Sequence, residues 1–244
     1  MHIATYREIQ QKIENVYRRG TVLWPDGKQK KITGAVSIEE AMRLATVILE
    51  GKCTTTLETG VAFGVSTLTM LLALDAVNAP GAIHYGVDPE QRTYHEGAAF
   101  ALQKEHGVRT HFELLEGPSH FQLPPLLERG VKIDFAFIDG WHTFDYTLLD
   151  FFYIDKLLKV GGIVAFHDCS WPSKRKVLGY LETHRKYELM PYPKAPVRYS
   201  AIKTLGSLRR GKFDVGHYAA RKVELLMYRK LESWEPNHDF FADF

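Results

Sequence analysis

The sequence has little cysteine and no long hydrophobic run. Among its 244 residues are two cysteines, Cys53 and Cys169. Two cysteines cannot form a disulfide framework, so they favour an interpretation as reduced thiols. No apolar stretch reaches the roughly 20 residues that a membrane-spanning helix needs, and the first 20 residues are charged throughout and lack the apolar core of a signal peptide. These absences predict a soluble, cytoplasmic protein with no membrane partner.

A strong excess of one charge is absent as well. The chain has 31 Lys and Arg residues against 29 Asp and Glu residues, which gives a net charge of +2. Such a balance provides no overall attraction to nucleic acids or acidic membranes. The basic stretch 203–230 is of a kind that usually forms a solvated face. A second interpretation of this stretch, as a receiver of an acidic acceptor or of RNA, stays open.

Internal repeats and low-complexity tracts are also missing, whereas hydrophobic residues are plentiful. They make up 45% of the chain, and aromatic residues make up 12%. This composition can bury a sizeable core, and the length suits one α/β domain with appendages. Residues 5–18 predict a polar helix, and Ser37 with Glu40 has the spacing of a capping box at the start of a second helix.

Short apolar runs alternate with helical segments along most of the chain. The predicted strands are TTTLETG, AIHYGVDP, THFELLEG, IDFAFIDG and GGIVAFHD, with YELMPY and RYSAIKTL as further candidates. The helical segments among them are residues 66–77, 94–106, 120–130, 147–160 and 173–185. This alternation predicts an α/β fold, a parallel sheet with crossover helices that the last two strands would complete to seven with an antiparallel finish. The sequence does not settle where residues 209–244 lie in this fold.

Acidic residues lie at or near the end of each of the first five predicted strands. They are Glu58, Asp88, Glu116, Asp139 and Asp168. Because the carboxyl ends of parallel strands meet at one edge of a sheet, we expect these carboxylates to form an acidic rim there. Such a rim prefers cationic groups, hydroxyls or a metal ion. For any single residue, an ordinary surface-loop acid is the alternative.

The turn after the first strand has an unusual glycine spacing. Residues 57–67, LETGVAFGVST, contain the pattern Glu58-x-Gly60-x-x-x-Gly64. A dinucleotide site would show G-x-G-x-x-G, with an acid about 20 residues further on. Here the acid Asp88 follows Gly60 by 28 residues. The extra residue and the early glutamate suit a ligand that has an amine and no pyrophosphate, held by backbone N–H groups at a helix start.

Four segments together resemble the motifs of the class I S-adenosylmethionine-dependent methyltransferases. They are ETGVAFGVST, GVDPE, EGPSH and FIDGWH, within roughly residues 37–170. The run from FIDGWH to GGIVAFHD further resembles the catechol and caffeoyl-coenzyme A type O-methyltransferases, the macrocin-type sugar O-methyltransferases and the cephalosporin-hydroxylase-like proteins. The resemblance implies a Rossmann-like, doubly wound, mostly parallel seven-stranded sheet with helices on both faces. The expected parts are an N-terminal helical arm (1–36), the S-adenosylmethionine-binding methyltransferase domain (37–205) and a C-terminal extension (206–244).

The resemblance also implies which residues hold S-adenosylmethionine. The predicted set is Glu58, Gly60, Ala62, Phe63, Gly64, Ser66, Asp88, Ser119, His120 and Asp139. The residues of the first turn would line the methionine part, and Ser66 would hold its carboxylate near a helix N-terminus. Ser66 as an ordinary N-cap is compatible with this role. Asp88 would accept both ribose hydroxyls. Ser119 and His120 would lie beside the adenine, and Asp139 would face the amino end and the reacting centre.

Methyl transfer to a hydroxyl requires alignment of donor and acceptor and a base for the proton. In the catechol-type enzymes a lysine base lies three residues after the strand-end aspartate, and here that position is His142. The resemblance therefore implies that Asp139 orients the acceptor while His142 takes the proton, which an imidazole with a pKa of about 6.5 suits. His167 is a second candidate base. The alternative for His142 is a loop histidine bonded to a backbone carbonyl.

A divalent metal ion is a further expectation with several alternatives. The resembling families bind Mg²⁺ through the strand-end aspartate and two adjacent polar residues after the next strand. The predicted ligands are thus Asp139, His167 and Asp168. Because Mg²⁺ prefers oxygen whereas imidazole suits Zn, Fe or Mn, either the ion is a softer one or the two aspartates alone bind it. In the last alternative no metal is bound, and Asp168 is a plain strand-end cap.

The sequence therefore predicts an enzyme, an S-adenosylmethionine-dependent methyltransferase that O-methylates a small-molecule hydroxyl, with divalent-metal assistance as an option. Trp141, Tyr146 and Trp171 either wall the acceptor pocket or form core lids. The alternatives are a divergent, hydroxylase-like member of the same fold and a nucleotide-binding Rossmann protein without methyl transfer. Base methylation is disfavoured, because no Asn-Pro-Pro-Tyr-like motif occurs and neither cysteine follows a proline. The acceptor's identity and the oligomeric state, a homo-oligomer included, are left open.

Overall fold

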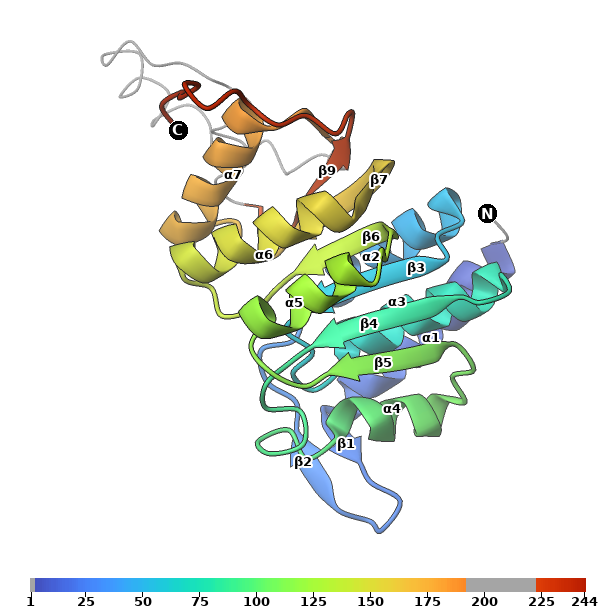
Figure 1. The fold of residues 1–244 in the computed structure, drawn as a ribbon. Helices are drawn as coiled ribbons and strands as arrows, with labels where there is room; N and C mark the ends of the chain where they lie inside the picture. The colour runs from blue at the N-terminus through green and yellow to red at the C-terminus, as the bar shows by residue number, and fades with distance from the viewer. Residues whose placement is uncertain (1–2, 192–222) are drawn as a thin grey trace, which may run out of the picture.

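A computed structural model describes residues 3–191 and 223–244, in which a seven-stranded sheet is flanked by helices (Figure 1). Its strands are β3 (Thr55–Thr59), β4 (Ile83–Val87), β5 (His111–Leu115), β6 (Ile133–Ile138), β7 (Leu158–Phe166), β8 (Tyr187–Leu189) and β9 (Leu226–Lys230). The strand order is β5-β4-β3-β6-β7-β9-β8, in which the first five are parallel and β9 runs antiparallel to β7 and β8. The predicted fold class, a doubly wound and mostly parallel α/β sheet, is confirmed.

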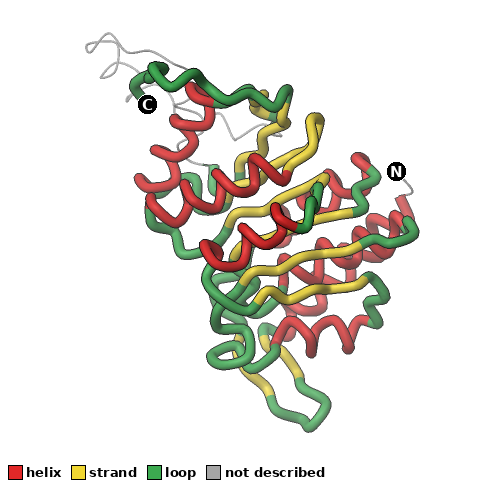
Figure 2. The backbone as a smooth tube through the Cα atoms, in the orientation of Figure 1, coloured by secondary structure: helices red, strands yellow, loops and turns green. Residues whose placement is uncertain are grey.

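Helices cover both faces of the sheet. They are α1 (Ile3–Arg19), α2 (Ile38–Gly51), α3 (Val65–Val77), α4 (Ala98–His106), α5 (Ser119–Glu128), α6 (Phe144–Leu157) and α7 (Pro172–His184). Figures 1 and 2 show α1 to α4 behind the sheet and α5 to α7 in front of it. Within the described ranges, no helix combines the length and the apolar character needed to cross a bilayer.

Strand β6 is buried on both faces, as its apolar run predicts. Successive side chains of a strand point to opposite faces. Phe135 and Phe137 pack into the core under α1 to α3, whereas Ala136 and Ile138 pack into the core under α5 to α7. The sheet is therefore the shared wall between two apolar layers.

The site is located by the point at which the chain reverses direction across the sheet. From β3 the chain proceeds through β4 to β5 on one side, and β6 and β7 then lie on the other side of β3. Thr59 at the end of β3 pairs with Val87 and with Ile138. The Gly60 amide donates to the Val87 carbonyl and the Asp139 amide to the Thr59 carbonyl, both over 2.9 Å. Three strand ends therefore open at the same level, where ligands bind in such sheets.

The N-terminal residues dock against the sheet's helical layer. The capping box is confirmed, because the Ser37 hydroxyl accepts from the Glu40 amide (3.2 Å) and the Glu40 carboxylate accepts from the Ser37 amide (2.8 Å). A hairpin that the sequence analysis did not predict, β1 (Thr21–Leu23) with β2 (Gln29–Lys31), lies between α1 and α2.

Two predicted helix boundaries are wrong by a few residues. The helix predicted over 147–160 ends at Leu157, because Leu158 adopts extended backbone angles and opens β7. The helix predicted over 94–106 begins only at Ala98. Glu96 and Gly97 have positive φ angles of 52° and 76°, which a right-handed helix cannot contain.

The antiparallel end of the sheet differs from the predicted one. β8 lies within the predicted strand YELMPY, but the candidate RYSAIKTL falls outside the described residues. The strand that pairs with β7 is β9, from the part of the chain that was not given a place. Lys230 at its end is buried, so this residue of the basic stretch does not belong to a solvated face.

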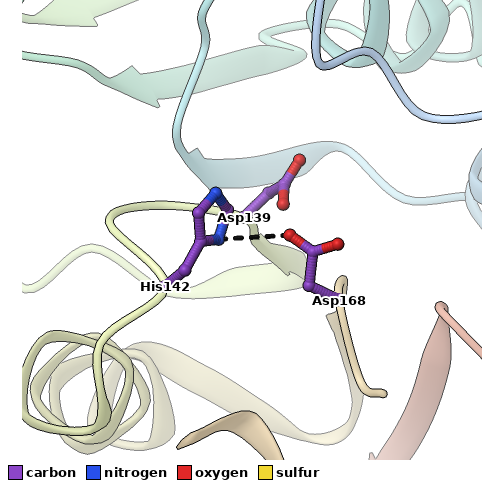
Figure 3. A group of neighbouring side chains, drawn as sticks. All are labelled: Asp139, His142 and Asp168. Atoms are coloured by element: carbon purple, nitrogen blue, oxygen red, sulfur yellow. Dashed lines mark ion pairs between the residues drawn. The ribbon is translucent and has the colours of Figure 1, made fainter. Parts of the chain in front are cut away.

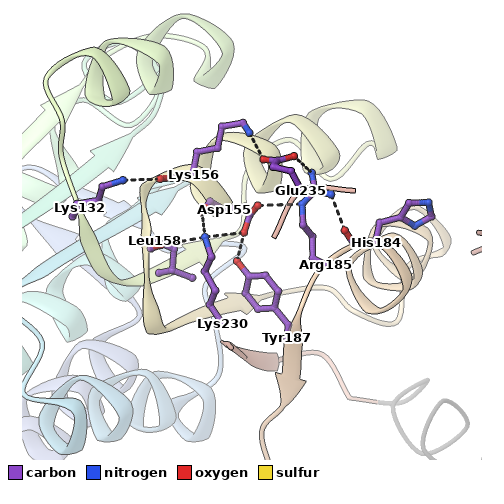
Figure 4. Close-up of polar contacts among 9 residues, drawn as sticks. All are labelled: Lys132, Asp155, Lys156, Leu158, His184, Arg185, Tyr187, Lys230 and Glu235. Carbon is purple, nitrogen blue, oxygen red and sulfur yellow. Dashed lines mark hydrogen bonds and ion pairs between the residues drawn. The ribbon is translucent and has the colours of Figure 1, made fainter. Parts of the chain in front are cut away.

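One buried carboxylate holds this end of the sheet together (Figure 4). Asp155 of α6 pairs with Arg185 Nε at 3.1 Å and with Lys230 Nζ at 3.2 Å. The Tyr187 hydroxyl donates to Asp155 over 2.6 Å, and Glu235 approaches the other side of Arg185 at 3.6 Å. Because buried charges are tolerated only with partners, α6, β8, β9 and the end of α7 depend on one another.

Replacement of Asp155 by Asn is expected to lower the free energy of unfolding by about 3–5 kcal/mol, because it leaves the buried Lys230 without its counter-charge and Arg185 with only the exposed Glu235. Urea unfolding followed by circular dichroism measures the effect. Glu235→Gln is the matched control: it removes an exposed partner of the same arginine and should cost less than about 1 kcal/mol. Equal losses in the two variants would contradict the assignment of Asp155 as the central charge.

Candidate functional site

The glycines of the turn after β3 are required by close backbone approach. Gly60 and Gly64 have φ angles of 90° and 83°, in the region that favours glycine. A Cβ on Gly60 would lie 2.5 Å from the Asp139 carbonyl oxygen, and a Cβ on Gly64 would lie 2.5 Å from the Ala99 Cα. The turn is therefore pressed against the end of β6 on one side and the start of α4 on the other.

Asp88, at the end of β4, ties this turn to the neighbouring strand. Its two carboxylate oxygens accept from the Ala62 and Glu90 amides, each over 2.7 Å. Ala62 has a φ of 46°, which turns its amide toward the carboxylate. Each oxygen still has a lone pair for another donor. The predicted contact of Asp88 with ribose hydroxyls stays a prediction that this geometry allows.

Glu58 lies beneath the turn and is fully buried. It accepts hydrogen bonds from the Ser66 hydroxyl (2.8 Å) and the Thr67 hydroxyl, and it pairs with His84 Nε2 at 3.0 Å. The sequence analysis expected Glu58 to bind the cofactor, but in this structure its carboxylate holds the first turn of α3. Ser66 lies at the second position of that helix, and the N-cap is Gly64.

A cleft lies over the turn, between the β3 and β6 ends and the segment before α2. It is lined by Gly60–Ser66, Asp139 and Thr33–Val36. Six predicted cofactor residues are among them: Gly60, Ala62, Phe63, Gly64, Ser66 and Asp139. The sequence analysis missed Thr33–Val36, whose only signal was a position just before the capping box.

Ser119 and His120 lie in the first turn of α5, apart from this cleft. Ser119 is buried. The His120 ring packs against Phe121 and Tyr146, with ring centroids 4.3 Å and 5.7 Å apart. Their predicted place beside an adenine ring stays a prediction.

The side chains of Asp139, His142 and Asp168 lie close together (Figure 3). Asp139, His142 and Asp168 each offer a ligand atom, and these atoms lie within 4.8 Å of one another. His142 Nδ1 lies 3.3 Å from the Asp168 carboxylate. His142 and Asp168 have φ angles of 52° and 53°, which residues other than glycine rarely adopt. Strained backbone of this kind is concentrated at functional sites.

The His142 ring is free to exchange a proton. Its Nδ1 makes no hydrogen bond of good geometry within the described structure, and its backbone carbonyl accepts from the Ser173 hydroxyl over 2.6 Å. The ring is therefore not the carbonyl-bonded loop histidine of the alternative interpretation. Burial lowers the pKa of His142, and the Lys174 ammonium lowers it further, against the opposing effect of Asp139 and Asp168. The imidazole is consequently neutral at pH 7.

His167 lies near both aspartates, with its Nδ1 3.7 Å from the Asp168 carboxylate, but it is not grouped with them as a ligand. Its Nδ1 lies 3.0 Å from Asp139, and its Nε2 lies 3.6 Å from Glu40. Burial alone would lower the pKa of His167, but these two carboxylates outweigh burial and raise it to about 10. An imidazolium can neither ligate a metal nor act as a base. His167 would have to lose its proton to serve as ligand or base, so its predicted roles stay predictions, and His142 is the histidine grouped with Asp139 and Asp168.

The donor set of Asp139, His142 and Asp168 fits a divalent ion. It combines two carboxylates with an imidazole nitrogen that has no hydrogen-bond partner. Mixed oxygen and nitrogen donors suit Mn²⁺, Fe²⁺ or Zn²⁺ better than Mg²⁺.

Two tryptophans flank this cluster at the surface. Trp141 is 68% exposed and Trp171 is 48% exposed. The Trp171 ring lies 5.3 Å from the His142 ring, centroid to centroid. Rings so exposed do not cover a core, which favours the interpretation as walls of an acceptor pocket.

The chain is similar to known methyltransferases. Residues 57–169 match a protein family described as a methyltransferase domain. The chain is 29% identical over 160 residues to tapetum-specific methyltransferase 1 of Arabidopsis thaliana, covering 62% of this chain and 64% of the relative. It is 31% identical over 140 residues to a putative caffeoyl-CoA O-methyltransferase of the same plant, covering 56% and 55%. The chain thus spans less than two thirds of the length of either relative.

A solved structure shows the same fold. The O-methyltransferase from Bacillus cereus, determined in complex with SAH (S-adenosylhomocysteine), has a TM-score of 0.58 and 15% identity, over 78% of this chain and 84% of that one. Together with the sequence matches, this confirms the expected resemblance to the class I methyltransferases and to their caffeoyl-coenzyme A type O-methyltransferases.

The charged state of His167 predicts a pH dependence of stability. A histidine whose pKa rises on folding, here to about 10, stabilises the fold fully below its unfolded pKa of about 6.5. That contribution is lost as the pH rises through 10. Between pH 6.5 and 10, the free energy of unfolding should fall by at least about 2 kcal/mol more in the wild type than in His167→Gln.

Urea unfolding at a series of pH values provides the measurement. His111→Gln removes an exposed histidine at the start of β5 and should leave the wild-type slope unchanged. Parallel curves for the wild type and His167→Gln would mean that His167 does not gain a proton on folding.

Proposed function

We propose that this chain binds S-adenosylmethionine and transfers its methyl group to a hydroxyl of a small molecule. The observation that carries the proposal is the position of His142, with a free ring nitrogen, beside the Asp139 that lines the cleft of the glycine turn. The matched family and the methyltransferases named above support it. The two free cysteines are buried, which accords with the predicted cytoplasmic setting.

The cleft residues suit the methionine end of this cofactor. The backbone N–H groups at the start of α3 favour a carboxylate, because a helix N-terminus carries partial positive charge. The carboxylate of Asp139 favours the amine and the sulfonium. Asp88 would hold the ribose through the lone pairs that the Ala62 and Glu90 amides leave free.

The proposed reaction is an in-line displacement at the methyl carbon. The acceptor hydroxyl loses its proton to His142, its oxygen forms the new bond to the methyl group, and the bond from the methyl carbon to sulfur breaks. S-adenosylhomocysteine leaves as a neutral thioether. Asp168, 3.3 Å from the His142 ring, stabilises the imidazolium that forms, and Asp139 orients the acceptor.

A divalent ion is a second way to activate the same hydroxyl. Bound by Asp139, His142 and Asp168, it would lower the pKa of the hydroxyl and orient it. A His142 nitrogen that ligates a metal cannot accept the proton, so the two roles of that nitrogen are alternatives. Trp141 and Trp171 suit a flat, apolar acceptor on either route.

Calorimetry tests the cofactor. We expect S-adenosylhomocysteine to bind and NAD not to bind. Asp88→Asn should weaken the binding of S-adenosylhomocysteine at least about tenfold, because it loses a charge-assisted bond to the ribose. Glu116→Gln, at the exposed end of the neighbouring β5, is the matched control and should bind as the wild type does.

Absence of S-adenosylhomocysteine binding by the wild type would overturn the proposal. Binding without transfer of labelled methyl to any compound of a hydroxylated panel would instead favour the hydroxylase-like or non-catalytic alternatives.

His142→Gln is expected to lower kcat by about 10²- to 10⁴-fold, the usual contribution of a general base. The affinity for S-adenosylhomocysteine should stay within about twofold, because the ring does not line the cleft. Transfer of labelled methyl is measured with saturating donor, with His111→Gln as the control. A kcat within about threefold of the wild type would exclude His142 as the base.

A further inference from the structure

Lys174, in the first turn of α7, is fully buried, with 0% of its surface exposed. Its Nζ has no hydrogen-bond partner in the structure that residues 3–191 and 223–244 describe. Lysine is almost never fully buried without a counter-charge, because desolvation of an ammonium is costly. Neither the proposed proton transfer nor the proposed cofactor contacts use this side chain.

The surroundings of Lys174 are acidic. Asp139, Asp150 and Asp168 all act electrostatically on it. Asp150 of α6 is buried as well, and its Oδ1 has no hydrogen-bond partner. The buried hydroxyl of Thr59 is also without one.

These polar groups lie directly behind the turn that bears the candidate base. A Cβ on Gly140 would be 3.2 Å from Asp150 Oδ2 and 3.4 Å from the Thr59 hydroxyl. The Ser173 hydroxyl, next to Lys174 in the chain, donates to the His142 carbonyl. The first turn of α7, which carries Lys174, therefore holds the His142 turn through Ser173.

The ionisation of the buried pair agrees with this arrangement. Burial raises the pKa of Asp150 to about 6, and the Ser119 and Thr59 hydroxyls and then the nearby Lys174 oppose the rise. Burial lowers the pKa of Lys174, and the three aspartates oppose that shift. Each group thus favours the charged form of the other.

We propose that Lys174 is a built-in counter-cation that offsets the charge of Asp139, Asp150 and Asp168 and weakens divalent-cation binding by the Asp139–His142–Asp168 cluster. A fixed positive charge repels an incoming ion of charge +2 strongly in a site that water screens poorly. The Asp139–His142–Asp168 cluster can therefore receive a hydroxyl or a sulfonium without a bound ion.

The test uses Mn²⁺ alone and the full chain without cofactor. The electron paramagnetic resonance signal of free Mn²⁺ reports the affinity, so no catalytic activity is needed. Lys174→Met, which keeps the length of the side chain and removes its charge, should tighten Mn²⁺ binding at least about tenfold. Lys176→Met is the matched control: it removes an exposed lysine of the same helix and should change the affinity by less than about twofold.

A second pair of variants separates charge from structural damage. Asp150→Asn alone should weaken Mn²⁺ binding several-fold. Combined with Lys174→Met it restores the net charge of the buried pair, so the double variant should return to within about threefold of the wild type. If Lys174→Met does not fold, Lys174→Gln or the double variant of Asp150→Asn with Lys174→Gln takes its place.

Unchanged or weaker Mn²⁺ binding by Lys174→Met overturns the inference, and so does a lack of binding by both this variant and the wild type. Mn²⁺ binding by Lys174→Met, without Mn²⁺ binding by the wild type, supports the inference. A double variant as tight as Lys174→Met overturns the pairing with Asp150. These outcomes are independent of the proposed methyl transfer, which the titration with S-adenosylhomocysteine decides.

Discussion

The contact between Gly60 and the Asp139 backbone is the constraint on which the site depends. The end of β3 and the end of β6 approach so closely that a Cβ would lie 2.5 Å from a carbonyl oxygen. The pairing of Thr59 with Ile138 fixes this approach from within the sheet. As a result, the turn that would hold the cofactor and the residues that would handle the proton share one wall. Displacement of either strand end would separate donor from base.

Around that contact the chain has assembled alternating buried charges. His167 lies between Asp139 and Glu40, and Lys174 lies among three aspartates. Asp139 and Asp168 follow strands β6 and β7 and Asp150 comes from α6, whereas Glu40 and Lys174 come from α2 and α7 on opposite faces of the sheet. Because an unpaired buried charge is costly, each element that contributes a charge also positions the others. The orientation of the site residues therefore depends on the packing of the two helical layers.

The sequence predicts the sheet well, because strands buried on both faces must be apolar and must end in turns, and β6 shows both features. The sequence predicts the burial of charged side chains less well, because tertiary contacts determine it. β9 ends in Lys230, which is buried only because Asp155 receives it. From the sequence alone, Lys174 in the polar helix α7 would be expected to be exposed to solvent. The adjacency of His167 and Asp168 in the sequence does not show that Asp168 lies next to His142 while His167 pairs with Asp139 and Glu40.

The different surroundings of His142 and His167 bear on how the site can work. His167 is held as an imidazolium by two carboxylates, and we propose Lys174 as a second cation near Asp139 and Asp168, so the chain itself supplies positive charge at the site. A metal bound through His142 would remove the free nitrogen that a proton needs, whereas internal cations leave it available. The charges on the protein are thus consistent with a base-driven transfer in which the positive charge near Asp139 belongs to the chain itself. In such a site the fold, and not a bound ion, would set the field that the acceptor hydroxyl meets.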